Sequence, residues 1–264
     1  STPGQRPFFL QCSFPDPHHP FTPPGRYWDM FDPAGVRLPD TFGAELVDPP
    51  PMVAWMREHR RRHPDFRPGH GAFAASEQEV REALALNHGS LACIDDAVGL
   101  VMAHLRQAGL DEDTVVIFTS DHGDLLGDRG LMFKGGLHYA PLTRVPFIWR
   151  DPGQARHHGR VVPALAQTID IAPTILARAG LRPANGMHGQ DLLPVLAGDA
   201  TQVREALLIE EESQRSDFGF DRRVRMRTLR DHDVRYTLYD GQPWGELYDL
   251  RSDPFELRNL WHEP

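Results

Sequence analysis

The stretch TVVIFTSDHGDLLGDRGLMFK, residues 114–134, decides how the rest of the sequence is interpreted. Its apolar run at 115–118 contains neither Pro nor Gly, which is typical of a strand buried on both faces. Because ligands of open α/β sheets collect beyond the carboxyl ends of the strands, Asp121 and His122 stand where a ligand is expected. A carboxylate and an imidazole side by side can offer an oxygen and a nitrogen to one cation. Lys134, in the same loop, can reach an anion held by that cation.

Several motifs in and after this stretch resemble those of one enzyme family. They are Ser-Asp-His-Gly-Asp at 120–124, Leu-Gly-Asp at 126–128, Phe-Lys-Gly at 133–135 and Thr-Arg-Val-Pro-Phe-Ile at 143–148. In this order and spacing, the sequence resembles the second half of a sulfatase of the alkaline-phosphatase superfamily. The resemblance implies that Asp121 and His122 bind a divalent metal ion, with calcium as the first choice and magnesium or manganese as alternatives. It also implies that Lys134 contacts the sulfate group, as a catalytic and substrate-binding residue.

A proline-rich segment near the start, PDPHHPF at 15–21, supplies two further candidates. Its prolines favour an extended loop, because proline lacks the N–H that would continue a sheet ladder. A histidine held there can donate a hydrogen bond to an anion or act as a general acid. The segment resembles the family's Pro-His-x-Pro motif, which implies that His18 is catalytic and makes His19 a second, substrate-binding candidate. We expect residues 7–14 before it to form a buried strand. A pair of surface histidines beside a proline turn is the alternative.

The earlier motifs of the family are not found in this sequence. Sulfatases carry a Cys-x-Pro-x-Arg pattern whose Cys is oxidised to formylglycine, the nucleophile, and paired aspartates that supply other metal ligands. Neither Cys12 nor Cys93 stands in such a pattern, and both have apolar neighbours that favour core positions. Two cysteines make no disulfide framework. The resemblance therefore predicts a chain without the family's N-terminal portion and without the formylglycine nucleophile.

A long helix is predicted over residues 76–108. Ser76 and Glu79, three residues apart, form a capping-box pattern, and the apolar residues after them recur at close to the helical period. Asp95 and Asp96 lie in the middle of this helix. Paired carboxylates can bind metal, but we interpret these two as a solvated face or as partners of a neighbouring arginine.

The alternation of this helix with apolar strands at 114–119 and 145–150 predicts an α/β fold. We expect a mixed, mostly parallel sheet flanked by helices, which is alkaline-phosphatase-like by resemblance. Further short strands are expected at 206–210, 224–229 and 234–239. The chain is accordingly divided into a partial sulfatase α/β domain, 1–197, and a small C-terminal α+β subdomain with an antiparallel sheet, 198–264.

The composition of the chain argues against two classes of partner, nucleic acids and membranes. The net charge of −9 and the lack of a long basic run argue against a nucleic-acid partner. No apolar stretch approaches the roughly 20 residues that span a bilayer, so no membrane partner is expected. No signal-peptide pattern is present at the start, which leaves the cytoplasm and the periplasm as open alternatives. Whether the chain forms a homo-oligomer is also left open.

The function implied by the resemblance is metal-dependent hydrolysis of a small-molecule or saccharide sulfate ester. A hydrated formylglycine attacks sulfur while the metal and basic residues neutralise the sulfate oxygens. This chain would supply only half of that site, so we expect the isolated chain to be inactive and to bind metal weakly. Two alternatives stay open: a phosphodiesterase or phosphonate monoester hydrolase of the same superfamily, and a non-catalytic module with this scaffold.

Overall fold

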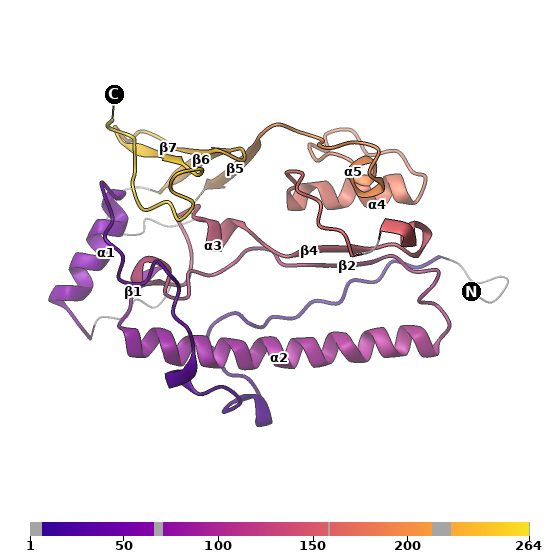
Figure 1. The fold of residues 1–264 in the computed structure, drawn as a ribbon, viewed down its shortest axis with the longest axis horizontal. Helices are drawn as coiled ribbons and strands as arrows, with labels where there is room; N and C mark the ends of the chain where they lie inside the picture. The colour runs from indigo at the N-terminus through magenta and orange to yellow at the C-terminus, as the bar shows by residue number, and fades with distance from the viewer. Residues whose placement is uncertain (1–6, 66–70, 158, 213–222, 264) are drawn as a thin grey trace.

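The computed structural model describes residues 7–65, 71–157, 159–212 and 223–263. Two strands, β2 (Val116–Thr119) and β4 (Phe147–Arg150), lie between layers of helices (Figure 1). The long helix α2 (Glu77–Gln107) runs along one side of this pair. Helices α4 (Ile171–Arg178) and α5 (Leu193–Ala197) lie on the other side. The α/β arrangement with flanking helices is therefore confirmed.

Helix α2 begins and ends as its sequence predicts. The Ser76 side chain accepts a hydrogen bond from the Glu79 N–H, and the Glu79 carboxylate accepts one of 2.8 Å from the Ser76 N–H. Beyond the helix, Gly109 has a φ of +66°, a left-handed conformation that glycine adopts without strain. Asp96 pairs with Arg26, which confirms the structural interpretation of this aspartate. Although α2 is long, no helix among the described residues is apolar enough to cross a membrane.

The strand pair at the centre differs from the expected mostly parallel pairing. Strands β2 and β4 are antiparallel, with Val116 opposite Arg150. The short strands β1 (Phe73–Ala74) and β3 (Leu131–Met132) also pair antiparallel. The chain leaves β2, forms the loop at 120–146 and returns beside the strand it left, so β4 runs in the opposite direction.

An antiparallel sheet forms the C-terminal part of the described chain, as predicted, and it has four strands where three were expected. Its strands, in spatial and sequence order, are β5 (Leu207–Glu212), β6 (Arg225–Arg230), β7 (Val234–Tyr239) and β8 (Gly245–Asp249). The strand β8 was not expected from the sequence. Along β6, buried and exposed residues alternate, because successive side chains point to opposite faces of a sheet.

Two hydrophobic cores meet at the loop that follows β2. The larger one joins the C-terminal sheet to helix α1 (Pro51–Arg62) and includes Leu131, which is fully buried. The smaller one lies under the first turns of α2 and includes Val80 and Met132. Leu131 and Met132, which are neighbours in β3, thus enter different cores, and this holds the loop after β2 in place. The remaining short elements are α3 (Ala140–Thr143) and the 3-10 helices Gly25–Tyr27, Pro33–Gly35, Asp128–Gly130, Pro152–His157 and Thr168–Asp170.

The segment before the proline-rich loop contradicts its prediction. Residues 7–14 form no strand, and Phe9 and Leu10 are each 75% exposed. Cys12 is exposed and Cys93 is half-buried, so the expected core positions of the cysteines are wrong as well. An apolar segment is buried only where another part of the chain covers it, and no described strand pairs with this one.

Candidate metal and anion site

The loop after β2 presents Asp121 and His122 at the surface. The Asp121 side chain is 83% exposed, and its Oδ2 lies 3.5 Å from His122 Nε2. Its Oδ1 accepts a hydrogen bond of 2.8 Å from the His122 N–H. Partial burial alone would raise the pKa of Asp121, but this hydrogen bond and the nearby imidazole outweigh it and lower the pKa. The carboxylate is therefore held in its charged form, as a cation ligand requires.

The orientation of His122 follows from one backbone contact. Its Nδ1 lies 2.8 Å from the carbonyl oxygen of Gly123, and a carbonyl can only accept. In the neutral ring the proton therefore sits on Nδ1, and Nε2 keeps a free lone pair beside Asp121. Gly123 itself is required here, because a Cβ at this position would lie 1.8 Å from the Pro141 carbonyl oxygen.

Asp124 closes the loop that carries Lys134. Its Oδ1 accepts hydrogen bonds from the N–H groups of Leu126, at 3.1 Å, and Phe133, at 3.0 Å. Both ends of the loop are thus tied to one carboxylate, and Lys134 follows immediately. Burial lowers the pKa of Lys134, while the carboxylates of Asp124 and Asp121 act in the opposite direction. The ammonium group therefore lies within electrostatic range of the predicted metal ligands.

The proline-rich segment brings both histidines to the same place. The His18 and His19 rings stack with centroids 4.1 Å apart, and His19 stacks on Phe133 at 4.0 Å. Burial lowers the pKa of His19, and the positive charges of His18 and Lys134 add to this effect, whereas Asp124 opposes it. His18 Nδ1 donates to the His19 carbonyl oxygen at 2.6 Å, which leaves Nε2 as the reactive nitrogen.

A carboxylate from the C-terminal sheet contacts the segment that follows Lys134. Glu211 of β5 accepts a hydrogen bond of 3.0 Å from the Gly136 N–H, and its other oxygen lies 3.3 Å from His138 Nε2. Burial alone would raise the pKa of Glu211, but the hydrogen bonds from His138 and Gly136 and the charge of His122 lower it. The sheet therefore reaches the loop that holds Lys134.

The structure thus places His18 and His19 against the loop at 120–146, which carries the other residues that the sequence singled out for a site. We use "the site cluster" for Asp121, His122, Lys134, His18 and His19. Sequence reasoning missed the contributions of Asp124, Phe133 and Glu211. Asp124 stands inside the quoted Ser-Asp-His-Gly-Asp motif, which was the available signal. Glu211 lies 75 residues after Gly136, in a Glu-Glu-Glu run that gives no sign of which carboxylate turns inwards.

Asp121 and His122 offer donors that suit a divalent cation, but only in part. An oxygen and a lone-pair nitrogen lie side by side on an exposed loop, with the histidine tautomer set for ligation. Among the described residues, no third His, Cys, Asp or Glu joins them in a group of three. Calcium prefers about six to eight oxygen ligands, so these two side chains alone would not complete a calcium site.

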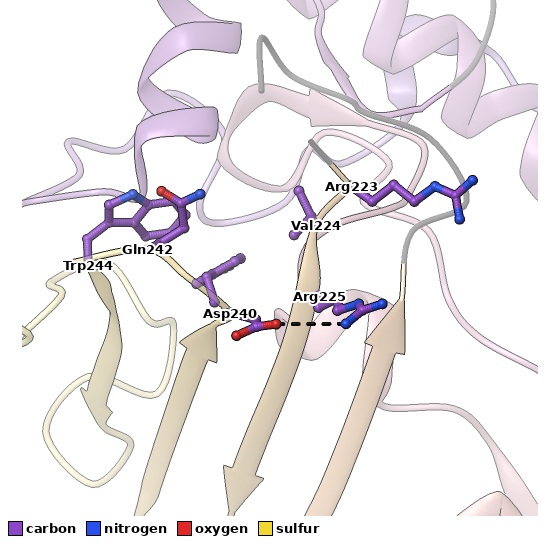
Figure 2. A pocket seen from close by; sticks show the side chains of 7 residues that line it. Arg223, Val224, Arg225, Asp240, Gln242 and Trp244 are labelled. Carbon is purple, nitrogen blue, oxygen red and sulfur yellow. Dashed lines mark ion pairs between the residues drawn. The ribbon is translucent and has the colours of Figure 1, made fainter. Parts of the chain in front are cut away.

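A separate cavity lies at one end of the C-terminal sheet (Figure 2). Its lining residues are Arg223, Val224, Arg225, Tyr239, Asp240, Gln242 and Trp244. Arg225 and Asp240 face each other across it, with Nη1 and Oδ2 4.0 Å apart. It shares no residue with the site cluster, and among the described residues it brings together no group of metal-ligating side chains.

Two family models cover this chain. The sulfatase model matches residues 1–181, and the model for the C-terminal part of N-sulphoglucosamine sulphohydrolase matches residues 127–264. The chain belongs to the sulfatase family. The two models overlap over residues 127–181, which include Lys134 but neither Asp121 nor His122.

Among curated proteins, the chain is similar to the multifunctional alkaline phosphatase superfamily protein PehA of Trinickia caryophylli, with 33% identity over 98% of this chain and 52% of the relative. It is also 29% identical to an arylsulfatase of Clostridium perfringens, over 97% of this chain and 49% of the relative. A choline-sulfatase of Rhizobium meliloti is 28% identical, over 99% and 48%. The chain therefore spans about half the length of the curated relatives it matches.

Among solved structures, the chain is similar to the phosphonate monoester hydrolase of Agrobacterium radiobacter, with a TM-score of 0.77 and 28% identity over 97% of this chain and 53% of that one. A 2-O glycosaminoglycan sulfatase gives a TM-score of 0.70 and 25% identity, over 87% and 48%. The expected alkaline-phosphatase-like fold class is thereby confirmed.

Proposed function

We propose that this chain carries the metal-binding and anion-binding half of an active site that hydrolyses sulfuric esters. The observation that supports it most is the convergence of the site cluster. Two histidines from the start of the chain stack beside the loop that holds Asp121, His122 and Lys134, more than 100 residues later. Membership of the sulfatase family and the similarity to an arylsulfatase and a choline-sulfatase support the same class of reaction.

Asp121 and His122 would hold the divalent cation, with calcium as the first candidate and magnesium or manganese as alternatives. When bound, the cation supplies positive charge against the oxygens of the ester group. The residues of this chain prepare that role beforehand. The hydrogen bond from its neighbour's N–H holds the Asp121 carboxylate, and the Gly123 carbonyl sets the tautomer of His122.

Lys134 and the two histidines would act on the ester itself. Negative charge grows on the tetrahedral group and on the leaving oxygen during ester cleavage, so a fixed cation beside it lowers the barrier. Lys134 supplies that cation. His18 presents Nε2 and, when protonated, can deliver a proton to the leaving oxygen. His19, held between His18 and Phe133, would contact the substrate.

The nucleophile lies outside what this chain provides. Neither cysteine of the sequence stands in a Cys-x-Pro-x-Arg pattern. The activity is therefore proposed for the whole protein, and we expect these 264 residues alone to turn over little or no aryl sulfate. The same reasoning predicts weak calcium binding by the chain alone, because two side-chain ligands leave most of the coordination sphere to water.

Hydrolysis of phosphonate monoesters or phosphodiesters is a second candidate. It is favoured by the similarity to PehA at 33% identity and to the phosphonate monoester hydrolase structure. Both reactions place a tetrahedral anion beside a metal, a lysine and a histidine, so the described half-site suits either. A scaffold without catalysis is the third alternative.

The test compares Lys134→Ala with wild type in the whole protein, on aryl sulfate, aryl phosphonate and bis-aryl phosphate esters. Loss of a cation that faces developing charge should lower kcat/KM by about 100-fold on the preferred ester. Arg37→Ala is the matched control, because this cation is 82% exposed and its ion-pair partner, Asp40, is not a member of the cluster. The ester with the highest wild-type kcat/KM distinguishes the two hydrolase candidates. Equal rates for Lys134→Ala and wild type, or no turnover of any ester, would refute the proposal.

A further inference from the structure

A chain of polar side chains runs from the C-terminal sheet to the loop that carries Lys134. Arg235 Nη1 donates to Thr237 Oγ1 at 2.9 Å, and Thr237 Oγ1 lies 2.7 Å from Thr228 Oγ1. Thr228 Oγ1 lies 2.8 Å from His138 Nδ1. His138 Nε2 lies 3.3 Å from Glu211 Oε2. We call these five residues the relay.

The chemistry of its two ends gives the relay one direction. A guanidinium can only donate and a carboxylate can only accept. Glu211 can only accept, so the His138 proton lies on Nε2, which faces it at 3.3 Å. In the neutral ring Nδ1 then accepts from the Thr228 hydroxyl, whose single proton is thereby used. Thr228 Oγ1 is left to accept from Thr237, which accepts in turn from Arg235.

Burial makes this direction costly to change. Arg235, Thr228 and Thr237 are fully buried, and His138 is 4% exposed. A hydroxyl turned the wrong way would leave a buried polar group without a partner, at a cost of about 1–3 kcal/mol. Glu211 is the member that reaches solvent, with a side chain 33% exposed. The relay therefore leads from a rigid interior to the surface of the site.

The interior end of the relay is firmly held. Arg235 bonds to Glu246 at 2.8 Å and to Glu256 at 2.5 Å, and both carboxylates are buried. Its guanidinium also lies over the rings of Tyr139, at 4.9 Å, and Tyr248, at 4.6 Å. A cation with carboxylates and aromatic faces around it has little freedom to move, so the first donor of the relay keeps its place.

The surface end acts on a backbone that needs support. Gly135 and Gly136 have φ values of +110° and +65°, so the two residues after Lys134 are conformationally permissive. Glu211 binds the loop at the second of these glycines, through its N–H, and just beyond it, through the His138 ring. Glu211 thus holds the Gly136 N–H, while the contact of His138 with Thr228 is the second tie between this segment and the sheet.

We propose that Glu211 and His138 are positioning residues for Lys134, and that the relay from Arg235 fixes the His138 tautomer that lets Glu211 hold the Lys134 loop. The proposal deepens the proposed function and rests on it only where anion binding is concerned. It assigns the C-terminal sheet a task at the site, although none of its residues need touch the substrate.

Thr228→Val tests the relay, because valine has nearly the same shape and no hydroxyl. Thr228→Ser restores the hydroxyl. Thr174→Val is the matched control, since Thr174 is another fully buried threonine whose hydroxyl bonds only to backbone groups near α4 and α5. The 264-residue chain suits the measurement, because Lys134 is the only lysine in its sequence. Selective labelling of lysine side chains with 13C therefore gives one signal, which reports on Lys134.

Two measurements follow each variant. The 15N spectrum of the His138 ring should show the Nε2–H tautomer in wild type and Thr228→Ser, and a mixture in Thr228→Val. The Lys134 signal should move in Thr228→Val without any ligand. In titrations with inorganic sulfate, the apparent Kd from that signal should rise about fivefold, as expected for the loss of one net hydrogen bond, and Thr228→Ser should restore it.

The outcomes separate this proposal from the proposed function. An unchanged tautomer and an unchanged Lys134 signal in Thr228→Val would overturn the relay, as would equal changes in Thr174→Val. If sulfate leaves the wild-type Lys134 signal unmoved, the proposed function fails. The tautomer and the ligand-free Lys134 signal then still decide whether the relay positions the loop.

Discussion

Charged side chains are buried in pairs in the C-terminal sheet but lie at the surface beyond the β2–β4 pair. In the sheet, Arg235 and Glu246 are fully buried and bound to each other. Beyond β2, Asp121 is 83% exposed, and among the described residues Lys134 has no ion pair within 4.0 Å. Exposed apolar residues do not separate the two regions, since Ile148 of β4 is 58% exposed and Leu229 of β6 is 51% exposed.

This difference separates charges that support the fold from charges that are available to a ligand. Buried ions are retained only with partners, because an unpaired ion in the interior is very costly. The sheet meets that condition with arginines, whose planar fork suits carboxylates. The exposed loop has instead the only lysine of the sequence, a compact point charge. The chain thus places its one lysine where an anion, and not a carboxylate of the fold, is the expected partner.

The largest effect is expected from Arg235→Ala. Removing this guanidinium leaves Glu246 and Glu256 buried without their shared partner, which should lower the free energy of unfolding by about 3–5 kcal/mol. Urea unfolding followed by circular dichroism measures the change. Arg227→Ala is the control, since Arg227 is 62% exposed in its pair with Glu210 and should cost no more than about 1 kcal/mol. Similar costs for both variants would mean that the buried network does not distinguish the sheet from a solvated surface.

The sequence predicted the parts of the fold that local chemistry determines. The helix over 76–108 followed from its capping box and period, and both appear in α2. The apolar run at 115–118 was correctly assigned to a strand. Its burial on both faces was wrong, because Phe118 is 39% exposed. Strand direction and burial depend on which distant segments cover a strand, and a single sequence does not contain that information for residues 7–14 either.

The second effect is a change in pH dependence through Glu246. Burial alone would raise the pKa of Glu246, but the charge and hydrogen bonds of Arg235 hold this pKa below its usual value of 4.5. A carboxyl with a lowered folded-state pKa contributes stability above its unfolded pKa, and this stability is lost as the pH falls through the folded pKa. Wild type should therefore lose stability progressively as the pH falls below about 4.5, because the unfolded chain then takes up a proton that the folded chain still refuses.

Glu246→Gln removes this titration. The variant should be less stable at pH 7, because Arg235 loses one anionic partner, but its stability should fall less steeply in acid. Glu212→Gln is the control, since that carboxylate is 58% exposed. Unfolding in urea at several pH values between about 3 and 7 gives both slopes. An acid slope for Glu246→Gln as steep as that of wild type would show that other carboxyls carry the effect.

The candidate site was predictable to the extent that it lies in one loop. Asp121, His122 and Lys134 share a stretch whose motifs suggest a family, and the resemblance added His18 from the start of the chain. The relay could not be found in this way. His138 and Thr228 are 90 residues apart, and strand alternation indicates only that Thr228 points inwards, not what it meets there. A contact of that kind is set by how the sheet docks on the loop.

The smallest effect is expected at the exposed face of the β2–β4 pair. Ile148→Thr keeps a β-branched side chain at a position that is 58% exposed, so it should change the free energy of unfolding by no more than about 0.5 kcal/mol. Leu131→Ala, at a fully buried position, should cost about 2–5 kcal/mol. Both variants are compared by urea unfolding in the 264-residue chain. A cost above about 2 kcal/mol for Ile148→Thr would mean that this face is covered in solution, because only a buried isoleucine loses that much when it becomes polar.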